Sequence, residues 1–228
     1  MPTVTIRVSM LLLALAAMPA SARPPTDVLV RSALREATVS LDTGCSGALA
    51  EQPQLIATAL HCVEKADKSV QARLSNGEVR RAWIVATDQV ADQAVLFMEE
   101  KVKLQPLDVV RRPQITGTVL YFQGHPERPR FQEARLDRVG TCQSLPALPN
   151  ALFTSIEGVP GDSGAPLVDG AGRIVGLVHG GADCHIATPA NTLAAMFEDI
   201  LGPAPKPQPV GFVPAPRPGD VPRACRAR

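Results

Sequence analysis

The stretch GDSGAP at residues 161–166 carries the strongest signal in the chain, in combination with TALHC at residues 58–62, about a hundred residues upstream. Between the two lies DQAVL, which begins at Asp92. A serine hydroxyl is a weak nucleophile near neutral pH, and it becomes a good one when an imidazole accepts its proton and a carboxylate orients that imidazole. The pattern predicts nucleophilic catalysis by Ser163, with His61 as general base and Asp92 as the orienting acid.

These segments resemble the trypsin/chymotrypsin-type serine proteases. TALHC differs from the family's TAAHC by one conservative change, and DxAVL is similar to the segment around the family's orienting aspartate. Asp88 is an alternative to Asp92, but bacterial relatives often carry a first aspartate at about this interval before the catalytic one, which favours Asp92. The resemblance implies an oxyanion hole formed by the backbone N–H groups of Gly161 and Ser163, because a glycine lets the backbone turn both donors inward.

Short strand-like runs separated by turn signals fill residues 37–201, without long helical stretches, and this indicates an all-β barrel or sandwich. SNGE at residues 75–78 is a strong hairpin signal between two of the runs. The predicted strands cover residues 37–41, 55–60, 69–74, 80–86 and 94–99 in the first half, and residues 117–122, 131–139, 151–156, 165–168 and 174–179 in the second.

The resemblance narrows this all-β prediction to a chymotrypsin-like fold: two antiparallel six-stranded β-barrels with the active site between them and a short C-terminal helix. We expect an N-terminal segment at residues 23–36, a first barrel at 37–110, and a second barrel with the helix at 111–201. The helix falls at residues 191–201, where apolar side chains have helical spacing.

The tail at residues 202–228 has eight prolines, four arginines and a lysine against one acid. Such a composition buries too little apolar surface to offset the entropy of ordering, so it predicts a disordered or polyproline-like spacer. The alternative is a docking or tethering tail in which Cys225 forms a crosslink. We expect no further peptide-binding domain after residue 201.

The N-terminus has the pattern of a secretory signal peptide at residues 1–22. Arg7 precedes an apolar run from Met10 to Met18, and ASA at residues 20–22 predicts cleavage after Ala22. The run is too short to span a bilayer. We therefore expect a secreted or periplasmic mature chain that begins near Arg23 and has no membrane span.

Cysteine usage fits an oxidising compartment, where disulfides persist. The resemblance implies a Cys45–Cys62 bond beside His61; Cys142 with Cys184 is the natural second pair, although sequence alone does not settle connectivity. Cys225 is left over. The cysteines and histidines lack the short ligand pairs of zinc sites, so we predict no metal and no cofactor.

Composition argues against nucleic-acid partners. The formal net charge is +1, and one Trp and one Tyr offer few stacking surfaces for single strands. The expected partner is a polypeptide substrate.

Other function classes fit less well. The α/β-hydrolases use GxSxG in the chain order Ser, acid, His, whereas residue 165 is alanine and the candidate partners after Ser163, Asp183 and His185, are nearly adjacent. A serine esterase and a catalytically inactive binding module on the same fold are the remaining alternatives. The intact set of His61, Asp92, Ser163 and the oxyanion glycine favours an enzyme.

Substrate preference is open at the sequence level. Counted from Ser163, Glu157 falls where trypsin-like members carry the acid at the pocket floor, although an outward surface glutamate fits equally well. His179 lies within one residue of a histidine that glutamyl endopeptidases use for acidic substrates; the alternative is a histidine on the barrel rim. Gly180 and Gly181 would pair with an extended substrate through their backbone groups.

Asp162 departs from the animal digestive enzymes. There the aspartate before the nucleophile pairs with a new N-terminal amine, but no Ile-Val-Gly-Gly-like tetrapeptide precedes Cys45. A buried, uncompensated carboxylate is costly, so Asp162 needs another partner or stays solvated. We expect activity without zymogen cleavage. The second half, including GHP at residues 124–126 and ATP at residues 187–189, also resembles bacterial high-temperature-requirement (HtrA-type) proteases and glutamyl endopeptidases.

Overall fold

A computed structural model of the chain describes residues 26–124, 129–143, 145–179 and 184–202. The expected signal peptide, the tail with Cys225, and the two glycines at positions 180 and 181 lie outside the described residues.

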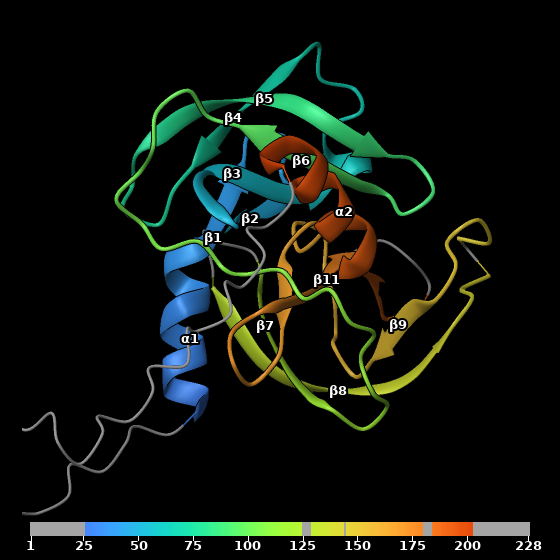
Figure 1. The fold of residues 1–228 in the computed structure, drawn as a ribbon. Coiled ribbons are helices and arrows are strands. Elements are labelled where there is room, and N and C mark those ends of the chain that lie inside the picture. Colours follow the sequence, from blue (N-terminus) through green and yellow to red (C-terminus); the bar gives the residue numbers. More distant parts are fainter. Residues whose placement is uncertain (1–25, 125–128, 144, 180–183, 203–228) are drawn as a thin grey trace, which may run out of the picture.

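Twelve strands form two closed barrels, each six-stranded, and every strand pairing is antiparallel. In Figure 1 the first barrel lies above the second. This architecture confirms the predicted fold class. The first barrel, in spatial order β1-β2-β3-β6-β5-β4, contains β1 (Thr38–Leu41), β2 (Ser46–Ala50), β3 (Gln52–Ala59), β4 (Ser69–Arg73), β5 (Val79–Asp88) and β6 (Gln93–Phe97). The second, in the order β10-β11-β12-β9-β8-β7, contains β7 (Val119–Gly124), β8 (Arg130–Gly140), β9 (Ala151–Thr154), β10 (Pro166–Val168), β11 (Ile174–His179) and β12 (Ile186–Pro189).

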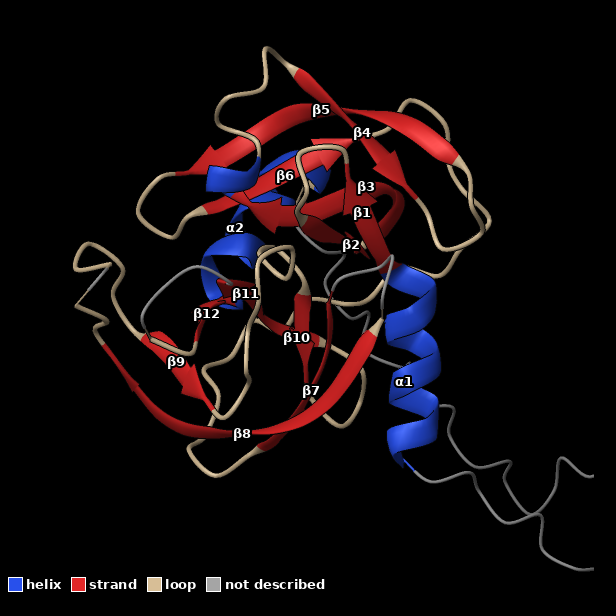
Figure 2. Cartoon of the chain, turned by 180° about the vertical axis from the view of Figure 1, so that it is seen from behind, coloured by secondary structure: helices blue, strands red, loops and turns tan. Residues whose placement is uncertain are grey.

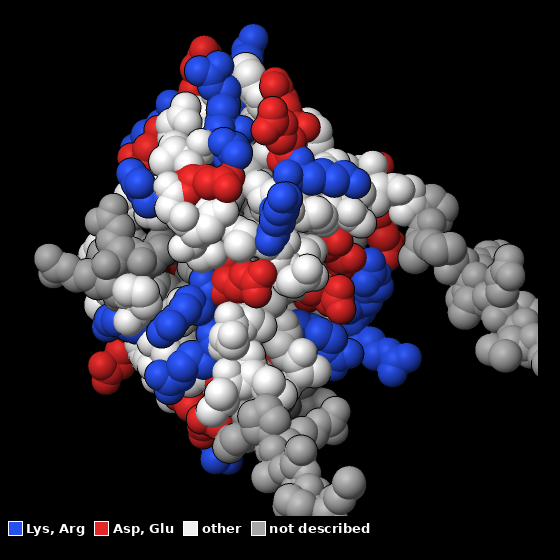
Figure 3. Space-filling model, turned by 90° about the vertical axis from the view of Figure 1, so that its left-hand side faces the viewer, with Lys and Arg blue, Asp and Glu red and all other residues white. Residues whose placement is uncertain are grey.

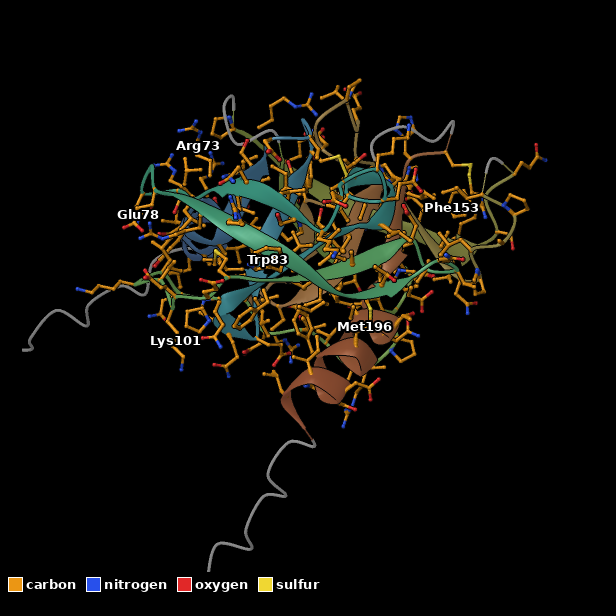
Figure 4. The ribbon with its side chains drawn as sticks, turned by 90° about the horizontal axis from the view of Figure 1, so that it is seen from above. Arg73, Glu78, Trp83, Lys101, Phe153 and Met196 are labelled. Carbon is orange, nitrogen blue, oxygen red and sulfur yellow. A yellow bond between two sulfur atoms is a disulfide. The ribbon has the colours of Figure 1, made fainter. Side chains whose placement is uncertain are left out.

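The predicted hairpin at SNGE joins β4 to β5. The Leu74 N–H donates to the Glu78 carbonyl at 2.8 Å, and Gly77 takes a positive φ of 86° that glycine adopts without steric cost. Figure 4 shows Arg73 and Glu78 at this end of the first barrel. All ten predicted strands correspond to strands of the structure, with ends that differ by a few residues.

Two strands are absent from the sequence prediction. β2 reads SGALA and has no β-branched or aromatic residue, yet all five of its residues are buried between β1 and β3. β12 reads IATP and leads directly into a helix. Both segments form strands because neighbouring strands of the barrel pair with them, and not because of their own strand propensity.

The N-terminal segment forms a helix, α1 (Thr26–Ala37), that the strand-based analysis does not anticipate. Val30, Leu34 and Ala37 repeat at helical spacing and are buried against the barrels. Figure 2 shows α1 standing beside β7. Arg31 adds a cation–π contact, its guanidinium carbon 4.1 Å from the centre of the Phe131 ring.

The predicted C-terminal helix is present as α2 (Ala190–Leu201). It buries Leu193, Ala194, Met196 and Phe197, and it contacts strands of both barrels, β6 and β11 among them. Figure 4 views α2 from above, with Met196 on the helix and Trp83 on β5 labelled. Because α1 contacts both barrels as well, the two helices join the halves of the molecule from different sides.

Charged side chains of both signs are interspersed on the face shown in Figure 3. Among the described residues no helix combines the length and the apolar character needed to cross a bilayer.

Candidate active site

His61 lies in a single 3-10 turn, η1 (Leu60–Cys62), which directly follows β3 of the first barrel. The next residue, Cys62, is bonded to Cys45, which directly precedes β2. The Leu60 N–H donates to the Asp92 carbonyl at 3.0 Å. The turn that carries the histidine is therefore fixed on one side by a covalent bond and on the other by the β5–β6 loop.

Asp92 lies at the end of that loop and contacts His61 twice. Its Oδ2 lies 2.7 Å from the His61 Nδ1, and its Oδ1 accepts the His61 backbone N–H at 2.9 Å. The side chains of His61 and Asp92 are 33% and 17% exposed, so both are partly accessible to solvent. A carboxylate at this distance stabilises the tautomer with the proton on Nδ1, which leaves the Nε2 lone pair as the basic site.

Asp88 has a different place. Its Oδ1 accepts the backbone N–H groups of Val90 and Ala91, both at 2.8 Å. It thus closes the loop that presents Asp92, and the structure brings Asp92 rather than Asp88 to the histidine.

Ser163 lies in a loop that is held between the two barrels. The Ser46 N–H donates to the Ser163 carbonyl at 2.9 Å, and the Ser46 hydroxyl donates to the Gly161 carbonyl at 2.6 Å. Gly164 has a φ of 82°, and a Cβ there would collide with the Ser46 carbonyl oxygen and the Thr58 hydroxyl. Only glycine allows this close approach, which brings the serine loop against the start of β2 and the end of β3, next to the histidine turn.

Asp162 is fully buried and has a partner. Its Oδ2 lies 3.1 Å from a guanidinium nitrogen of Arg130 and accepts the Val159 N–H at 2.9 Å. The same guanidinium nitrogen donates to the Glu157 carbonyl at 2.7 Å. Gly124 makes room for this carboxyl, since a Cβ at that position would collide with it. Of the two alternatives left by the sequence, a partner other than the N-terminal amine is what the structure contains.

Gln93, next to Asp92, is a residue that the sequence analysis misses. It is fully buried, and its amide nitrogen donates to the Thr188 hydroxyl and the Pro189 carbonyl of β12, both at 2.9 Å. These bonds tie the strand that follows Asp92 to the second barrel. A glutamine in a strand carries no sequence signal for such a role, because its partners lie 95 and 96 residues away.

Both expected disulfides are present in the structure. Cys45 is joined to Cys62, and Cys142 to Cys184, which links the loop after β8 to the segment before β12.

His179, at the end of β11, lies against His61 and Asp92. Its Nε2 is 3.3 Å from the Asp92 Oδ2, and its ring centre is 4.6 Å from that of His61, with the ring planes tilted by 39°. Burial lowers the pKa of His179 below the usual value, the neighbouring His61 lowers it further, and Asp92 opposes both effects.

The other predicted specificity residue, Glu157, is exposed, and the contacts that hold it in place are made by its backbone. Its carbonyl accepts from Arg130 at 2.7 Å, and its N–H donates to the Gln132 side-chain oxygen at 3.3 Å. Gly180 and Gly181 follow His179 directly in the chain and lie outside the described residues.

Two groups of side chains among the described residues bring three metal-ligating atoms within 4.8 Å of one another. In the first, Cys45 and Cys62 are bonded to each other and are not available as thiolates. The second is His61, Asp92 and His179, where the Asp92 Oδ2 is hydrogen-bonded to the His61 Nδ1 at 2.7 Å and lies 3.3 Å from the His179 Nε2. A metal ion there would have to displace the proton between the His61 ring and the carboxylate.

Comparisons with known proteins agree with the geometry. Residues 45–177, more than half of the chain, match a sequence-family model described as Trypsin-like peptidase domain. No curated protein sequence matches. Among solved structures, the HtrA-type protease AlgW with tripeptide is similar at 23% identity and a TM-score of 0.67, covering 78% of this chain and 64% of that one. A substituted form of AlgW with tripeptide is similar at 22% identity and the same TM-score, covering 77% and 64%. At these identities the two matches establish the fold, and the chain spans just under two thirds of their length.

Proposed function

Because this chain belongs to the trypsin-like peptidase domain family, we propose that it is a serine endopeptidase that hydrolyses peptide bonds through His61, Asp92 and Ser163. The observation that carries the proposal is the double contact of Asp92 with His61, to the ring Nδ1 and to the backbone N–H. This contact sets both the tautomer and the orientation that a general base next to a serine requires.

The proton transfers follow from that tautomer. His61 accepts the Ser163 hydroxyl proton on Nε2 as the serine oxygen attacks the peptide carbonyl, and the resulting imidazolium is stabilised by Asp92. The same proton then passes to the leaving amine, which leaves an acyl-enzyme. A water molecule, deprotonated by His61, attacks the ester, and the proton returns to Ser163 as the acid product departs.

The negative charge that develops on the carbonyl oxygen needs donors in place. We assign this role to the backbone N–H groups of Gly161 and Ser163. Gly161 has a φ of 99°, and its carbonyl is engaged by the Ser46 hydroxyl, so the loop around it is anchored before substrate binds. Donors that are fixed in advance cost no reorganisation in the transition state.

The substrate is a polypeptide in an extended conformation, which would lie along the chain after β11 and pair with Gly180 and Gly181. The AlgW structures similar to this chain contain a tripeptide, which supports a peptide ligand. A preference for Lys or Arg through Glu157, or for acidic substrates through His179, remains part of this proposal.

The protein acts in a secreted or periplasmic location. The sequence pattern of residues 1–22 and the two disulfides support this location, because disulfides persist in oxidising compartments.

The direct test compares amide and ester substrates. The full chain should cleave an unfolded polypeptide and a peptide amide, and Ser163→Ala should abolish both activities. Hydrolysis of small esters without any peptide cleavage would identify a serine esterase instead. Absence of hydrolysis of either substrate class would leave the inactive binding module.

A further inference from the structure

A cavity of about 330 Å³ lies between the two barrels, where the C-terminal end of α1 meets β1, β4 and β7. Figure 2 shows this end of α1 beside β1, with β7 running alongside the helix. The volume is at the lower end of the range of small-molecule sites. None of the residues that line this inter-barrel cavity contributes to the candidate active site.

The walls of the inter-barrel cavity are polar because the outward faces of strands from both barrels meet there. On β1, Thr38 and Ser40 alternate with the core residue Val39, so their side chains face outward. Arg73 of β4 is the direct partner of Ser40 across the sheet, and its side chain therefore lies on the same face. Gln123 comes from β7 of the second barrel. All four polar residues line the cavity.

A hydrogen bond between the β4–β5 hairpin and α1 holds two walls of the cavity together. The Ser75 hydroxyl donates to the Glu36 carbonyl at 2.7 Å. Glu36 directly follows Arg35 in the last turn of α1. Ser75 lies two residues after Arg73, so the bond brings both arginines to the same cavity. Figure 4 labels Arg73 at this end of the first barrel.

The charge of the lining favours an anion. Arg35 and Arg73 form no ion pair within the part of the chain that the structure describes. Among the described residues, the lining contains no Asp or Glu. The Glu36 carboxylate accepts the Gln105 N–H at 2.9 Å and is not part of the wall. Two guanidinium groups without a carboxylate match the oxygens of an anionic ligand, because their planar forks donate two parallel N–H groups.

Two polar side chains of the wall are buried without a hydrogen-bond partner among the described residues. Gln123 is 4% exposed, and its amide forms no such bond. Thr38 is 2% exposed, and its hydroxyl has no partner either. Native proteins pair nearly all buried polar groups with protein, water or ligand atoms, because an unpaired group destabilises the fold. The Gln123 amide therefore needs an acceptor inside the cavity.

We propose that the inter-barrel cavity is a binding site for a small organic carboxylate. The carboxylate oxygens accept N–H groups from Arg35, Arg73 and Gln123. Leu74 and Pro129 line the cavity as well, and these apolar side chains fit a short hydrocarbon body better than a bare inorganic anion. The inference goes beyond the proposed peptidase function and does not depend on it.

The experiment measures binding to the full chain by isothermal titration calorimetry. The probe is 4-methylpentanoate, which combines a carboxylate with a branched hydrocarbon body. Its amide, 4-methylpentanamide, keeps the body and removes the charge. Acetate keeps the carboxylate and shortens the body, and inorganic phosphate tests the bare anion.

Three variants test the assignment of the cavity. Arg73→Gln removes one guanidinium at an exposed position, and Gln123→Glu places a carboxylate in the wall with little change in size. Arg135→Gln, at an exposed position of β8 outside the cavity, is the matched control for the change in charge. Ser163→Ala separates binding from the proposed catalysis.

We expect the wild type to bind 4-methylpentanoate with a Kd of about 1 mM or lower. Arg73→Gln should weaken this binding by about 10-fold or more, because a charge-assisted contact is lost. Gln123→Glu should abolish it, because the new carboxylate repels the ligand and competes for both arginines. Arg135→Gln and Ser163→Ala should bind as the wild type does, and 4-methylpentanoate should raise the melting temperature of all proteins that bind it.

An absence of 4-methylpentanoate binding to the wild type would overturn the inference. Equal affinity for 4-methylpentanamide would identify an apolar groove instead, and equal or tighter binding of acetate or phosphate would identify a site for bare anions. Wild-type affinity in a folded Arg73→Gln or Gln123→Glu would place the ligand elsewhere. A wild type that binds 4-methylpentanoate but cleaves no peptide would refute the proposed function alone.

Discussion

Two aspartates four residues apart have separate roles at the residue scale. Asp88 accepts two backbone N–H groups and shapes the loop, and Asp92 at the end of the loop contacts His61. Asp92 itself has a φ of 51°, in the left-handed region that Asp and Asn tolerate better than most residues. The β5–β6 loop determines this backbone conformation of Asp92, and the hydrogen bonds of Asp88 hold that loop in place.

This division predicts different effects of the same substitution. Asp92→Asn should lower kcat by about 10⁴-fold, because an amide donates to Nδ1 and stabilises the wrong tautomer of His61. Asp88→Asn keeps an acceptor for the loop and should change kcat by less than about 10-fold. Steady-state kinetics on one peptide substrate measures both, and similar losses in the two variants would contradict the assignment of Asp92.

His179 also predicts a pH dependence of stability. Its pKa is lowered in the folded state, so between that value and the unfolded value near 6.5 the unfolded chain binds more protons. The resulting contribution to stability is fully present above the unfolded pKa and is lost as the pH falls toward the folded pKa.

The melting temperature of the wild type should therefore decline relative to that of His179→Gln as the pH is lowered from 8 to 5. Thermal unfolding of the wild type and of His179→Gln between pH 8 and pH 5 checks this prediction. A difference in melting temperature that is independent of pH would contradict the lowered pKa.

At the scale of elements, β8 supplies the charge that the serine loop needs. Arg130, the first residue of β8, places its guanidinium 3.1 Å from the buried carboxylate of Asp162, which directly precedes Ser163. A buried carboxylate that loses its only cationic partner is strongly destabilised. The Arg130–Asp162 pair fills the role for which the digestive enzymes use a new N-terminal amine, and this supports activity without zymogen cleavage.

We therefore expect Arg130→Ala to reduce kcat/KM and to destabilise the fold by up to about 3 kcal/mol, with water reducing the effect because Arg130 is partly exposed. Arg135→Ala, at an exposed position of the same strand, is the matched control. Kinetics and chemical denaturation would be measured on protein that begins at Arg23. Full activity of Arg130→Ala, or activity only after further N-terminal trimming, would contradict this role.

The strands and helices differ in how well the sequence predicts them. Strands such as β5 and β11 are rich in β-branched residues and are predicted well, whereas β2 is built from small residues that the barrel recruits. Helix α1 has a detectable signal, the helical spacing of Val30, Leu34 and Ala37, but a single short helix is easily missed beside a long series of strand-like runs.

At the scale of the whole molecule, the candidate active site lies between the two barrels. His61 and Asp92 come from the first barrel, and Ser163 and His179 come from the second. Ser46 and Gln93 hold the two barrels together through side-chain hydrogen bonds to Gly161 and Thr188, which lie 115 and 95 residues further along the chain. The contact between His61 and Asp92 could be predicted because the motifs around both residues are short and local. These supporting residues could not, because only the folded structure brings their partners together.

The contact between the two barrels predicts that a residue remote from the reacting atoms affects both stability and catalysis. Gln93→Leu removes one buried and one partly buried hydrogen bond and leaves the Thr188 hydroxyl and the Pro189 carbonyl with one partner fewer. We expect a loss of about 1–3 kcal/mol in unfolding free energy and a lower kcat with little change in KM. Urea denaturation and kinetics measure these changes. An unaltered unfolding free energy together with an unaltered kcat would show that the contact between the barrels does not depend on Gln93.

The most direct test of the central claim is covalent labelling of the full chain with a fluorophosphonate, followed by mass spectrometry of the peptides. The account predicts one adduct, on Ser163, in the wild type, strongly reduced labelling in His61→Ala, and none in Ser163→Ala. An unlabelled wild type, an adduct on another residue, or undiminished labelling of Ser163→Ala would contradict it.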